Sequence, residues 1–258
     1  MANLALITGA SSGIGAALAR LHAEKGGDLI VTARRKSALD ALKTEVEAAH
    51  GVTVHVLEYD LAADGGADAL ADAVAAIGTP DILINNAGLG GHGKHIARDL
   101  AAEQAMIDLN IKALVTLTHR IGGDMARRGS GRILNLGSTA GFAPGPGQAV
   151  YFATKAFVNS FSQALDHELR PRGVTCTLLA PGYVETEFAD VADMHGTAMV
   201  KSGGASAQDV AKHGYDAMMQ GKLVTINDPK LSFLMQWVIP LLPRRLVLRT
   251  VGASQSKN

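Results

Sequence analysis

The chain has 258 residues, enough for one large α/β domain or two small ones, and 47% of them are hydrophobic against 19% charged. This composition excludes an intrinsically disordered chain, which would lack the apolar residues that form a core. Lys and Arg together number 24, the same as Asp and Glu, so no nucleic acid is expected as a partner, since neutralisation of phosphates supplies most of that affinity.

Short apolar runs alternate along the chain with longer segments of helical period. The predicted strands span residues 4–8, 28–34, 52–59, 81–86, 132–138, 174–180 and 223–228. The predicted helices span residues 13–25, 37–49, 64–77, 99–128, 149–170 and 206–220. Nearly continuous apolar runs are typical of strands that are buried on both faces of a parallel sheet. The pattern therefore predicts one domain over residues 1–258, with a doubly wound, seven-stranded parallel sheet flanked by helices on both faces.

The first predicted strand runs into a glycine-rich turn, "TGASSGIG" at residues 8–15, which opens a helix. Gly9, Gly13 and Gly15 would let the backbone approach a pyrophosphate, and the helix N-terminus offers free N–H groups and positive potential. Glycines also end strands for steric reasons alone. The order strand, turn, helix nevertheless favours a dinucleotide site.

The second predicted strand ends in basic residues, Arg34 and Arg35. A site for NAD would present an acid here for the ribose 2′-hydroxyl, whereas a guanidinium can bind a 2′-phosphate with two hydrogen bonds. The alternative is a solvated basic loop. We expect NADP(H) as the cofactor, with NAD(H) as the alternative.

The fourth predicted strand closes with "NNAG" at residues 85–88. Asparagine tolerates unusual backbone angles, and glycine lets the chain pass close to a ligand. In open α/β sheets, ligands bind at the carboxyl ends of the strands. We therefore expect a second wall of the cofactor site here.

Tyr151 and Lys155, in "YFATK", are four residues apart on a predicted helix. That spacing puts the two side chains on one face, about 5–6 Å apart. In isolation such a pair indicates a solvated stripe. A nearby ammonium would favour the phenolate, however, and would lower a tyrosine pKa that is ordinarily about 10.

Several motifs taken together resemble the short-chain dehydrogenase/reductase family over about residues 4–228. In chain order they are "TGASSGIG" (8–15), "NNAG" (85–88), Asn110, Ser138, "YFATK" (151–155) and "PGYVET" (181–186). The resemblance implies a Rossmann-like fold and an oxidoreductase that transfers a hydride between NADP(H) and a carbonyl or secondary alcohol, without a metal. It also implies a homodimer or homotetramer, joined through the helices at 99–128 and 149–170.

The resemblance also implies catalytic roles for four residues. Tyr151 would be the general acid in carbonyl reduction and the base in alcohol oxidation, and Lys155 would bind the nicotinamide ribose and lower the pKa of Tyr151. Ser138 would donate a hydrogen bond to the substrate oxygen. Asn110 would hold a water that links Lys155 to solvent; from the residues alone, it is equally an asparagine inside a helix that caps a local bend.

The cofactor contacts implied by the resemblance extend from the glycine-rich turn to the segment after the sixth strand. They are Gly9, Ser11, Ser12, Gly13, Ile14, Gly15, Arg34, Arg35, Asp60, Leu61, Asn86, Ala87, Gly88, Tyr151, Lys155, Pro181, Gly182, Val184 and Thr186. Among them, Asp60 is expected to accept a hydrogen bond from the adenine amino group.

The substrate side is expected to come from residues 139–151, the stretch after Gly88, and a flexible segment at 183–205 without a clear period. These regions contain Phe142, Pro144, Pro146, Tyr183 and Phe188. Few fixed charges lie near, which favours an uncharged or moderately apolar carbonyl compound. His92 and His95 are candidates for the mouth of the site or simply solvated loop residues, and Glu185 and Glu187 are expected to face solvent.

The C-terminal extension, residues 231–258, is apolar with basic residues. It would pack on the domain, bury against another subunit, or lie at a membrane surface. The last alternative would suit a membrane-surface lipid or steroid reductase. A non-enzymatic NADP-binding sensor or scaffold is the other alternative function.

The single cysteine, Cys176, excludes an internal disulfide and a metal site built from cysteines. The first residues, "MANLALITGA", lack the charged region and cleavage site of a signal peptide. No apolar run approaches the ~20 residues of a spanning helix. These features favour a cytoplasmic protein.

Overall fold

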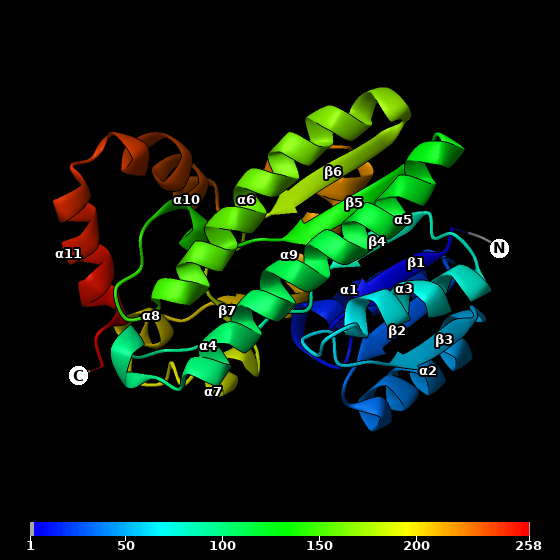
Figure 1. The fold of residues 1–258 in the computed structure, drawn as a ribbon, viewed down its shortest axis with the longest axis horizontal. Coiled ribbons are helices and arrows are strands. Elements are labelled where there is room, and N and C mark those ends of the chain that lie inside the picture. Colours follow the sequence, from blue (N-terminus) through cyan, green and yellow to red (C-terminus); the bar gives the residue numbers. More distant parts are fainter. Residues whose placement is uncertain (1–2, 258) are drawn as a thin grey trace.

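Seven parallel strands form the central sheet of the computed structural model, which describes residues 3–257 (Figure 1). Their order is β3-β2-β1-β4-β5-β6-β9. Their bounds are β1 Ala5–Thr8, β2 Leu29–Ala33, β3 Val54–Glu58, β4 Ile82–Asn85, β5 Gly131–Leu136, β6 Val174–Leu179 and β9 Val224–Thr225. Residues 1, 2 and 258, the ends of the predicted domain, lie outside the described residues. The predicted seven-stranded parallel sheet is confirmed.

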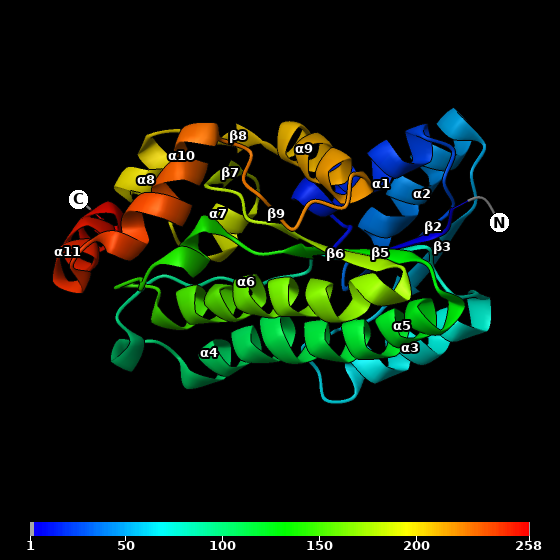
Figure 2. The ribbon, with the colours of Figure 1, turned by 90° about the horizontal axis from the view of Figure 1, so that it is seen from above.

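Helices cover both faces of the sheet, as Figure 2 shows. On one face lie α1 Gly13–Glu24, α2 Lys36–His50 and α9 Ala207–Met219. On the other lie α3 Gly66–Ile77, α4 Leu100–Ile107, α5 Leu114–Arg128 and α6 Ala149–Leu169. The doubly wound arrangement predicted from the alternating pattern is therefore confirmed.

The order of the strands reverses at β1, which pairs with β2 on one side and β4 on the other. Ile7 is opposite Val31 in one pairing and opposite Ile84 in the other. Connections leave these strands toward opposite directions of the sheet, so a crevice opens at their carboxyl ends. The glycine-rich turn and "NNAG" both lie at that edge.

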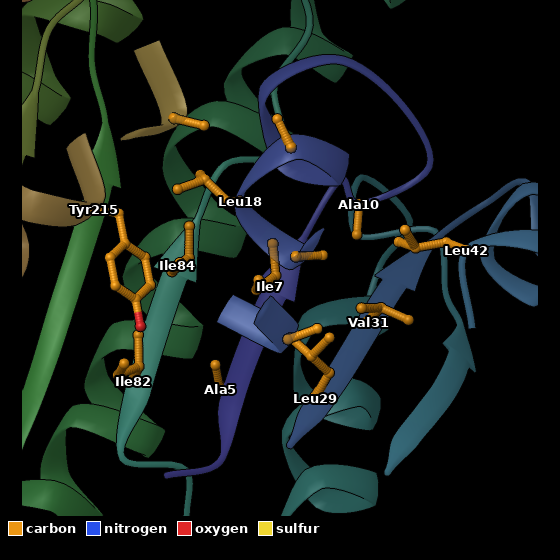
Figure 3. Packing of buried hydrophobic residues seen from close by; sticks show 14 of the residues in the cluster. Ala5, Ile7, Ala10, Leu18, Leu29, Val31, Leu42, Ile82, Ile84 and Tyr215 are labelled. Carbon is orange, nitrogen blue, oxygen red and sulfur yellow. The ribbon is translucent and has the colours of Figure 1, made fainter. Parts of the chain in front are cut away.

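The core is divided by the sheet because successive side chains on a strand point to opposite faces. Ile7, Val31 and Ile84 pack toward α1 and α9, where Leu18 and Tyr215 join them (Figure 3). Each side chain of this size that is fully buried contributes about 1.5–3 kcal/mol to folding. The buried residues on both faces fix the strands whose carboxyl ends carry the site.

Some predicted bounds differ from the structure. The helix predicted over 99–128 is interrupted between α4 and α5 by a π-helical turn at Asp108–Ala113, whose wider winding displaces one side chain of the helix. The strand predicted over 223–228 has only the two residues of β9, since Val224 and Thr225 alone pair with β6. Ser206 caps the N-terminus of α9, because its hydroxyl accepts a hydrogen bond from the backbone N–H of Asp209 at 3.0 Å.

The segment 183–205, which shows no clear period in the sequence, contains short regular elements. They are β7 Val184–Glu185, α7 Phe188–Val191, α8 Ala198–Lys201 and β8 Ala205–Ser206. A small cluster of Ala189, Ala192 and Met194 forms its own core. Helices of four residues are too short to produce a detectable period in a sequence.

The C-terminal extension is helical, with α10 Pro229–Phe233, a π-helical turn at Leu234–Val238, a 3-10 turn at Ile239–Leu241 and α11 Arg244–Gln255. Helix α11 lies beside α8 at one end of the molecule (Figures 1 and 2). The part before it exposes apolar side chains, since Phe233, Trp237 and Leu241 are 63%, 68% and 85% exposed. No helix within residues 3–257 combines the length and apolar character that crossing a bilayer requires.

Candidate active site

A cavity of about 550 Å³ lies at the carboxyl ends of the strands. It extends from the glycine-rich turn, past the ends of β2, β4 and β5, to the first turn of α6 and the C-terminal helix α11. Every residue of the predicted cofactor set except Gly15 lines it. Of the four predicted catalytic residues, Ser138, Tyr151 and Lys155 line it, whereas Asn110 does not.

The glycine-rich turn has a backbone shape that side chains would obstruct. Gly9 has a φ of +67°, and a Cβ atom there would lie 2.8 Å from the side-chain nitrogen of Asn86. Gly13 has a φ of +55°, and its Cβ would lie 3.2 Å from Thr186. A Cβ on Gly15 would collide with the carbonyl of Gly9, so Gly15 lets α1 begin close to the turn instead of lining the cavity. A direct contact of Gly15 with the cofactor stays a prediction.

This cradle fits the pyrophosphate of a nicotinamide dinucleotide. The exposed backbone of the turn leads into α1, whose N-terminal N–H groups and dipole attract an anion. Asn86 braces the opposite wall, because its side chain donates to the carbonyl oxygens of Thr8 at 2.8 Å and Gly9 at 3.2 Å. The glycine turn and the "NNAG" segment are thus held together as the two walls that their sequences predicted.

The ribose end of the cavity carries both predicted arginines. Arg34 and Arg35 line it together with Asp60, whose carboxylate accepts a hydrogen bond from the backbone N–H of Ala62 at 3.0 Å. Arg35 is paired with Glu187, at 2.6 Å between Nη2 and Oε2, and this guanidinium holds the pKa of the Glu187 carboxyl below its usual range. Glu187 is exposed, as expected, but it also lines the cavity and has a cationic partner, which the sequence did not predict.

Tyr151 lies on the first turn of α6, half-buried, with its ring 5.5 Å from that of Phe188. Burial raises the pKa of Tyr151 to about 12, because phenolate loses its hydration, while a hydrogen bond with the Ser138 side chain acts in the opposite direction. This direction contradicts the predicted lowering of the pKa. Lys155 Nζ is 5.9 Å from the centroid of the tyrosine ring, and its attraction for phenolate does not outweigh the desolvation in this structure.

Lys155 is itself 5% exposed, and its ammonium donates a hydrogen bond to the carbonyl oxygen of Leu136 at 2.8 Å. Burial lowers its pKa to about 8. The same loss of water therefore disfavours the charged form of both residues. In isolation, "YFATK" would place Tyr151 and Lys155 on a solvated face of the helix. Lys155 does not lie on such a face, because it is buried and lines the cavity.

Ser138 follows β5 and is 9% exposed. Its hydroxyl accepts a hydrogen bond from the backbone N–H of Ala140 at 3.0 Å. Asn159, one turn beyond Lys155 on α6, donates to the Ser138 carbonyl oxygen at 3.0 Å. These bonds fix the backbone at Ser138, and no local pattern in the sequence indicates the part that Asn159 plays.

Asn110 lies in the π-helical turn between α4 and α5 and is buried. Its Oδ1 accepts from the backbone N–H of Leu89 at 2.8 Å, and its Nδ2 donates to the Leu89 carbonyl at 2.9 Å. The same Nδ2 donates to Thr154 Oγ1 at 3.0 Å. Asn110 thus ties the loop after Gly88 to helix α6, a contact that neither of the sequence alternatives described.

The substrate end of the cavity is mostly apolar. Its lining includes Leu89, Ala140, Ala143, Phe152, Tyr183, Phe188, Val191, Met194, Met199, Met235 and Val251. Tyr183 and Phe188 were expected there, whereas Phe142, Pro144 and Pro146 lie outside the lining. His92 and His95 also lie outside it, because they bond to the Gln255 carbonyl and the Glu103 carboxylate respectively.

Two polar residues of the lining, Gln148 and Gln255, were missed in the sequence. Gln148 precedes Tyr151 by three residues, the spacing of one helical turn, and that spacing is a signal that could have identified it. Gln255 belongs to α11, far along the chain, and no local pattern connects it with the site.

Comparisons with known proteins agree with this geometry. The model of the short chain dehydrogenase family matches residues 3–195. Sulfoacetaldehyde reductase 2 of Chromohalobacter salexigens is 40% identical over 213 residues, which cover 80% of this chain and 79% of that protein.

Solved structures show the same fold. A short-chain dehydrogenase from Sphingobium yanoikuyae in complex with NADPH is 33% identical, covers 89% of each chain and has a TM-score of 0.84. A short chain dehydrogenase/reductase from Burkholderia phymatum in complex with NAD is 27% identical, covers 91% of this chain and 92% of its own, and has a TM-score of 0.81. The expectation of a nicotinamide dinucleotide cofactor is thereby confirmed, and the chain belongs to the short-chain dehydrogenase/reductase family.

Proposed function

We propose that this oxidoreductase transfers a hydride between NADP(H) and an uncharged carbonyl compound or the corresponding secondary alcohol. The observation that carries the proposal is that Ser138, Tyr151 and the buried Lys155 line one cavity together with the glycine-rich turn. A protein that only bound the cofactor would not require Ser138 and Tyr151 together at the far end of its site. This distinguishes the proposal from a sensor or scaffold.

The protein's part in the reaction is to position the carbonyl and to move one proton. The cofactor, when bound, supplies or accepts the hydride. Ser138 donates a hydrogen bond to the carbonyl oxygen and stabilises the negative charge that develops there. Tyr151 gives its phenolic proton to the same oxygen.

The protonation states favour reduction near neutral pH. With a pKa of about 12, Tyr151 keeps its proton and is ready to act as an acid. In the reverse direction it must first lose that proton, and the positive charge on Lys155 then stabilises the phenolate. Lys155, fixed by the Leu136 carbonyl, also lies where it would hold the nicotinamide ribose.

The preference for NADP(H) is supported by Arg34 and Arg35 at the ribose end. A 2′-phosphate carries more charge than a hydroxyl, and two guanidinium groups can bind it with several charge-assisted hydrogen bonds. The structural relative from Sphingobium yanoikuyae is solved with NADPH, although the one from Burkholderia phymatum is solved with NAD. Glu187 is paired with Arg35, and its negative charge reduces the gain in affinity that the 2′-phosphate provides.

The test is consumption of the reduced cofactor over a panel of uncharged ketones and aldehydes, with NADPH and NADH in parallel and sulfoacetaldehyde as a charged comparison. We expect turnover of uncharged carbonyl compounds, faster with NADPH at equal concentration. Cofactor binding without turnover on any carbonyl compound would contradict the enzymatic proposal and favour the sensor or scaffold.

We also propose that copies of the chain associate through α4, α5 and α6 in the cytoplasm. Ile107 on α4 and Phe157 on α6 are 38% and 37% exposed, and Phe157 stacks on Phe161 at 5.5 Å. Apolar side chains on neighbouring outer helices suit a symmetric interface. Analytical ultracentrifugation is expected to show a dimer or tetramer, and Phe157→Glu to shift it toward the monomer.

A further inference from the structure

The C-terminal helix α11 forms part of the wall at the substrate end of the cavity. Val251, Ser254 and Gln255 line the cavity from this helix. The Gln255 carbonyl lies 2.6 Å from His92 Nε2, and Lys257 is paired with Asp193 at 2.7 Å. Contacts to two different loops therefore hold the end of α11 in place.

A further contact joins α11 to the loop that leads into α6. A Cβ atom on Gly147 would lie 3.8 Å from Gln255 Cβ, and one on Gly252 would lie 3.6 Å from Pro146 Cβ. These are ordinary packing distances between the two segments. Gln255 is thus packed beside the residue that precedes Gln148, and the two glutamines belong to one part of the wall.

Both glutamine amides are buried and incompletely hydrogen-bonded. Gln148 is 2% exposed and Gln255 is 3% exposed. Among residues 3–257, Gln148 Nε2 and Gln255 Oε1 have no hydrogen-bond partner. A buried polar atom without a partner costs about 1–3 kcal/mol. One amide lacks an acceptor and the other lacks a donor, and both atoms have almost no accessible surface. When the two side chains turn toward the cavity, a single hydroxyl group could accept from Gln148 Nε2 and donate to Gln255 Oε1.

The charges around the cavity exclude an anionic group at this end. Among the described lining residues, the cationic side chains are Arg34, Arg35 and Lys155. The two arginines lie at the ribose end, and Lys155 is committed to the Leu136 carbonyl and the catalytic tyrosine. A sulfonate or carboxylate here would be buried without a counter-charge, at a cost of several kcal/mol.

The remaining lining is apolar and adaptable. Met194, Met199 and Met235 come from three different segments. Methionine side chains are unbranched and flexible, so they can pack against apolar bodies of different shape. Ser254 also lines this wall, but its hydroxyl already donates to the Val251 carbonyl at 2.8 Å. The unpaired polar atoms of the wall on which the inference rests are therefore those of the two glutamines.

We propose that the substrate is an uncharged ketone or aldehyde with an apolar body and a second polar group, a hydroxyl, which pairs with Gln148 and Gln255. This rests on the proposed function, since it concerns the same site. It separates this chain from the relative named for sulfoacetaldehyde, whose sulfonate would find no cation here. It also makes α11 a determinant of specificity.

The test compares three ketones that share one apolar skeleton and differ at the end remote from the carbonyl, with a hydroxyl, a methyl or a carboxylate. In the wild type we expect kcat/KM to be about tenfold or more higher for the hydroxyketone than for the methyl ketone, and lowest for the carboxylate. Gln148→Met and Gln255→Met should each reduce the ratio of kcat/KM for the hydroxyketone to kcat/KM for the methyl ketone about tenfold. Gln220→Met, on the exposed end of α9, is the matched control and should change nothing.

A binding measurement separates this inference from the proposed function. The dissociation constant of the hydroxyketone is measured by NADPH fluorescence in the Tyr151→Phe protein, where no turnover is needed. Binding that Gln255→Met weakens about tenfold supports the inference even if no substrate is reduced, and only the proposed function would then fail. Equal binding of the hydroxyl and methyl ketones, tighter binding of the carboxylate, or no effect of either glutamine variant would overturn the inference.

Discussion

Arg35 on the loop after β2 and Glu187 before α7 form an ion pair across the ribose end of the cavity, with 2.6 Å between Nη2 and Oε2. The side chains are 52% and 56% exposed, so water screens the pair and its net contribution to stability is at most about 1 kcal/mol. A 2′-phosphate that binds Arg35 must replace this carboxylate or share the guanidinium with it. The ion pair therefore weakens the binding of NADP(H) more than the binding of NAD(H).

We predict that Glu187→Gln tightens NADPH binding several-fold and leaves NADH binding unchanged, because only NADPH brings a phosphate near this carboxylate. Fluorescence titration with each cofactor measures both dissociation constants. Arg35→Gln should weaken NADPH binding at least tenfold. Glu185→Gln, on the same segment, is the control, and an equal change for NADPH and NADH in Glu187→Gln would show that the carboxylate acts on something other than the phosphate.

Asn110 is expected to act mainly on stability and on the shape of the loop after Gly88. Asn110→Ala removes three hydrogen bonds and leaves the N–H and C=O of Leu89 unpaired, which should lower the free energy of unfolding by about 2–4 kcal/mol. Urea denaturation measures this change. Asp108→Ala, in the same π-helical turn but paired with the exposed Lys112, should lower the free energy of unfolding far less, because water screens that pair. A loss no larger than that of Asp108→Ala would refute the bracing role of Asn110.

Lys155 should reduce stability at neutral pH. Its pKa in the folded protein is about 8 against an ordinary 10.5, so the unfolded chain binds a proton between about pH 8 and pH 10.5 that the folded protein does not. Unfolding thus takes up protons in this window, and wild-type stability rises there as the pH rises. Below pH 8 the cost of burying the ammonium is present in full.

Lys155→Met removes this cost together with the bond to Leu136. We expect a gain of about 1–2 kcal/mol in the free energy of unfolding at pH 7, which shrinks toward pH 10, and a loss of activity. Denaturation at the two pH values measures it. A variant whose free energy of unfolding is lower than that of the wild type by the same amount at pH 7 and at pH 10 would contradict the assignment of a buried ammonium.

The two directions of the reaction should depend on pH differently. Reduction uses the protonated Tyr151, and a pKa of about 12 keeps it protonated over the neutral range; its rate should stay nearly constant between about pH 6 and pH 8. Oxidation uses the phenolate, so its rate should rise with pH, by up to about tenfold per unit while the tyrosine remains mostly protonated. Steady-state kcat profiles in both directions measure this, and an oxidation rate independent of pH would be incompatible with a tyrosine base.

The sheet and the walls of the site could be predicted because their signals are local. A run such as "LALIT" followed by Gly9, Gly13 and Gly15 specifies a buried strand and a turn without reference to the rest of the chain. The order of such motifs then indicated the family, and with it the positions of Ser138 and Tyr151.

What could not be predicted depends on contacts between distant segments. The π-helical turn is coupled to the bonds between Asn110 and Leu89, which the helical period does not reveal. The raised pKa of Tyr151 follows from desolvation, a property of the assembled cavity and not of the spacing to Lys155. Gln255 reaches the cavity only because α11 folds back along the loop before α6.

The most direct test of the central claim is the turnover of one uncharged ketone with NADPH by the wild type and by Tyr151→Phe. The phenyl ring keeps the packing against Phe188 and removes only the proton donor. We predict a fall in kcat of at least about a thousandfold, with the NADPH dissociation constant within about threefold of the wild type. A Tyr151→Phe protein that reduces the ketone at a rate close to that of the wild type would contradict the claim that Tyr151 supplies the proton.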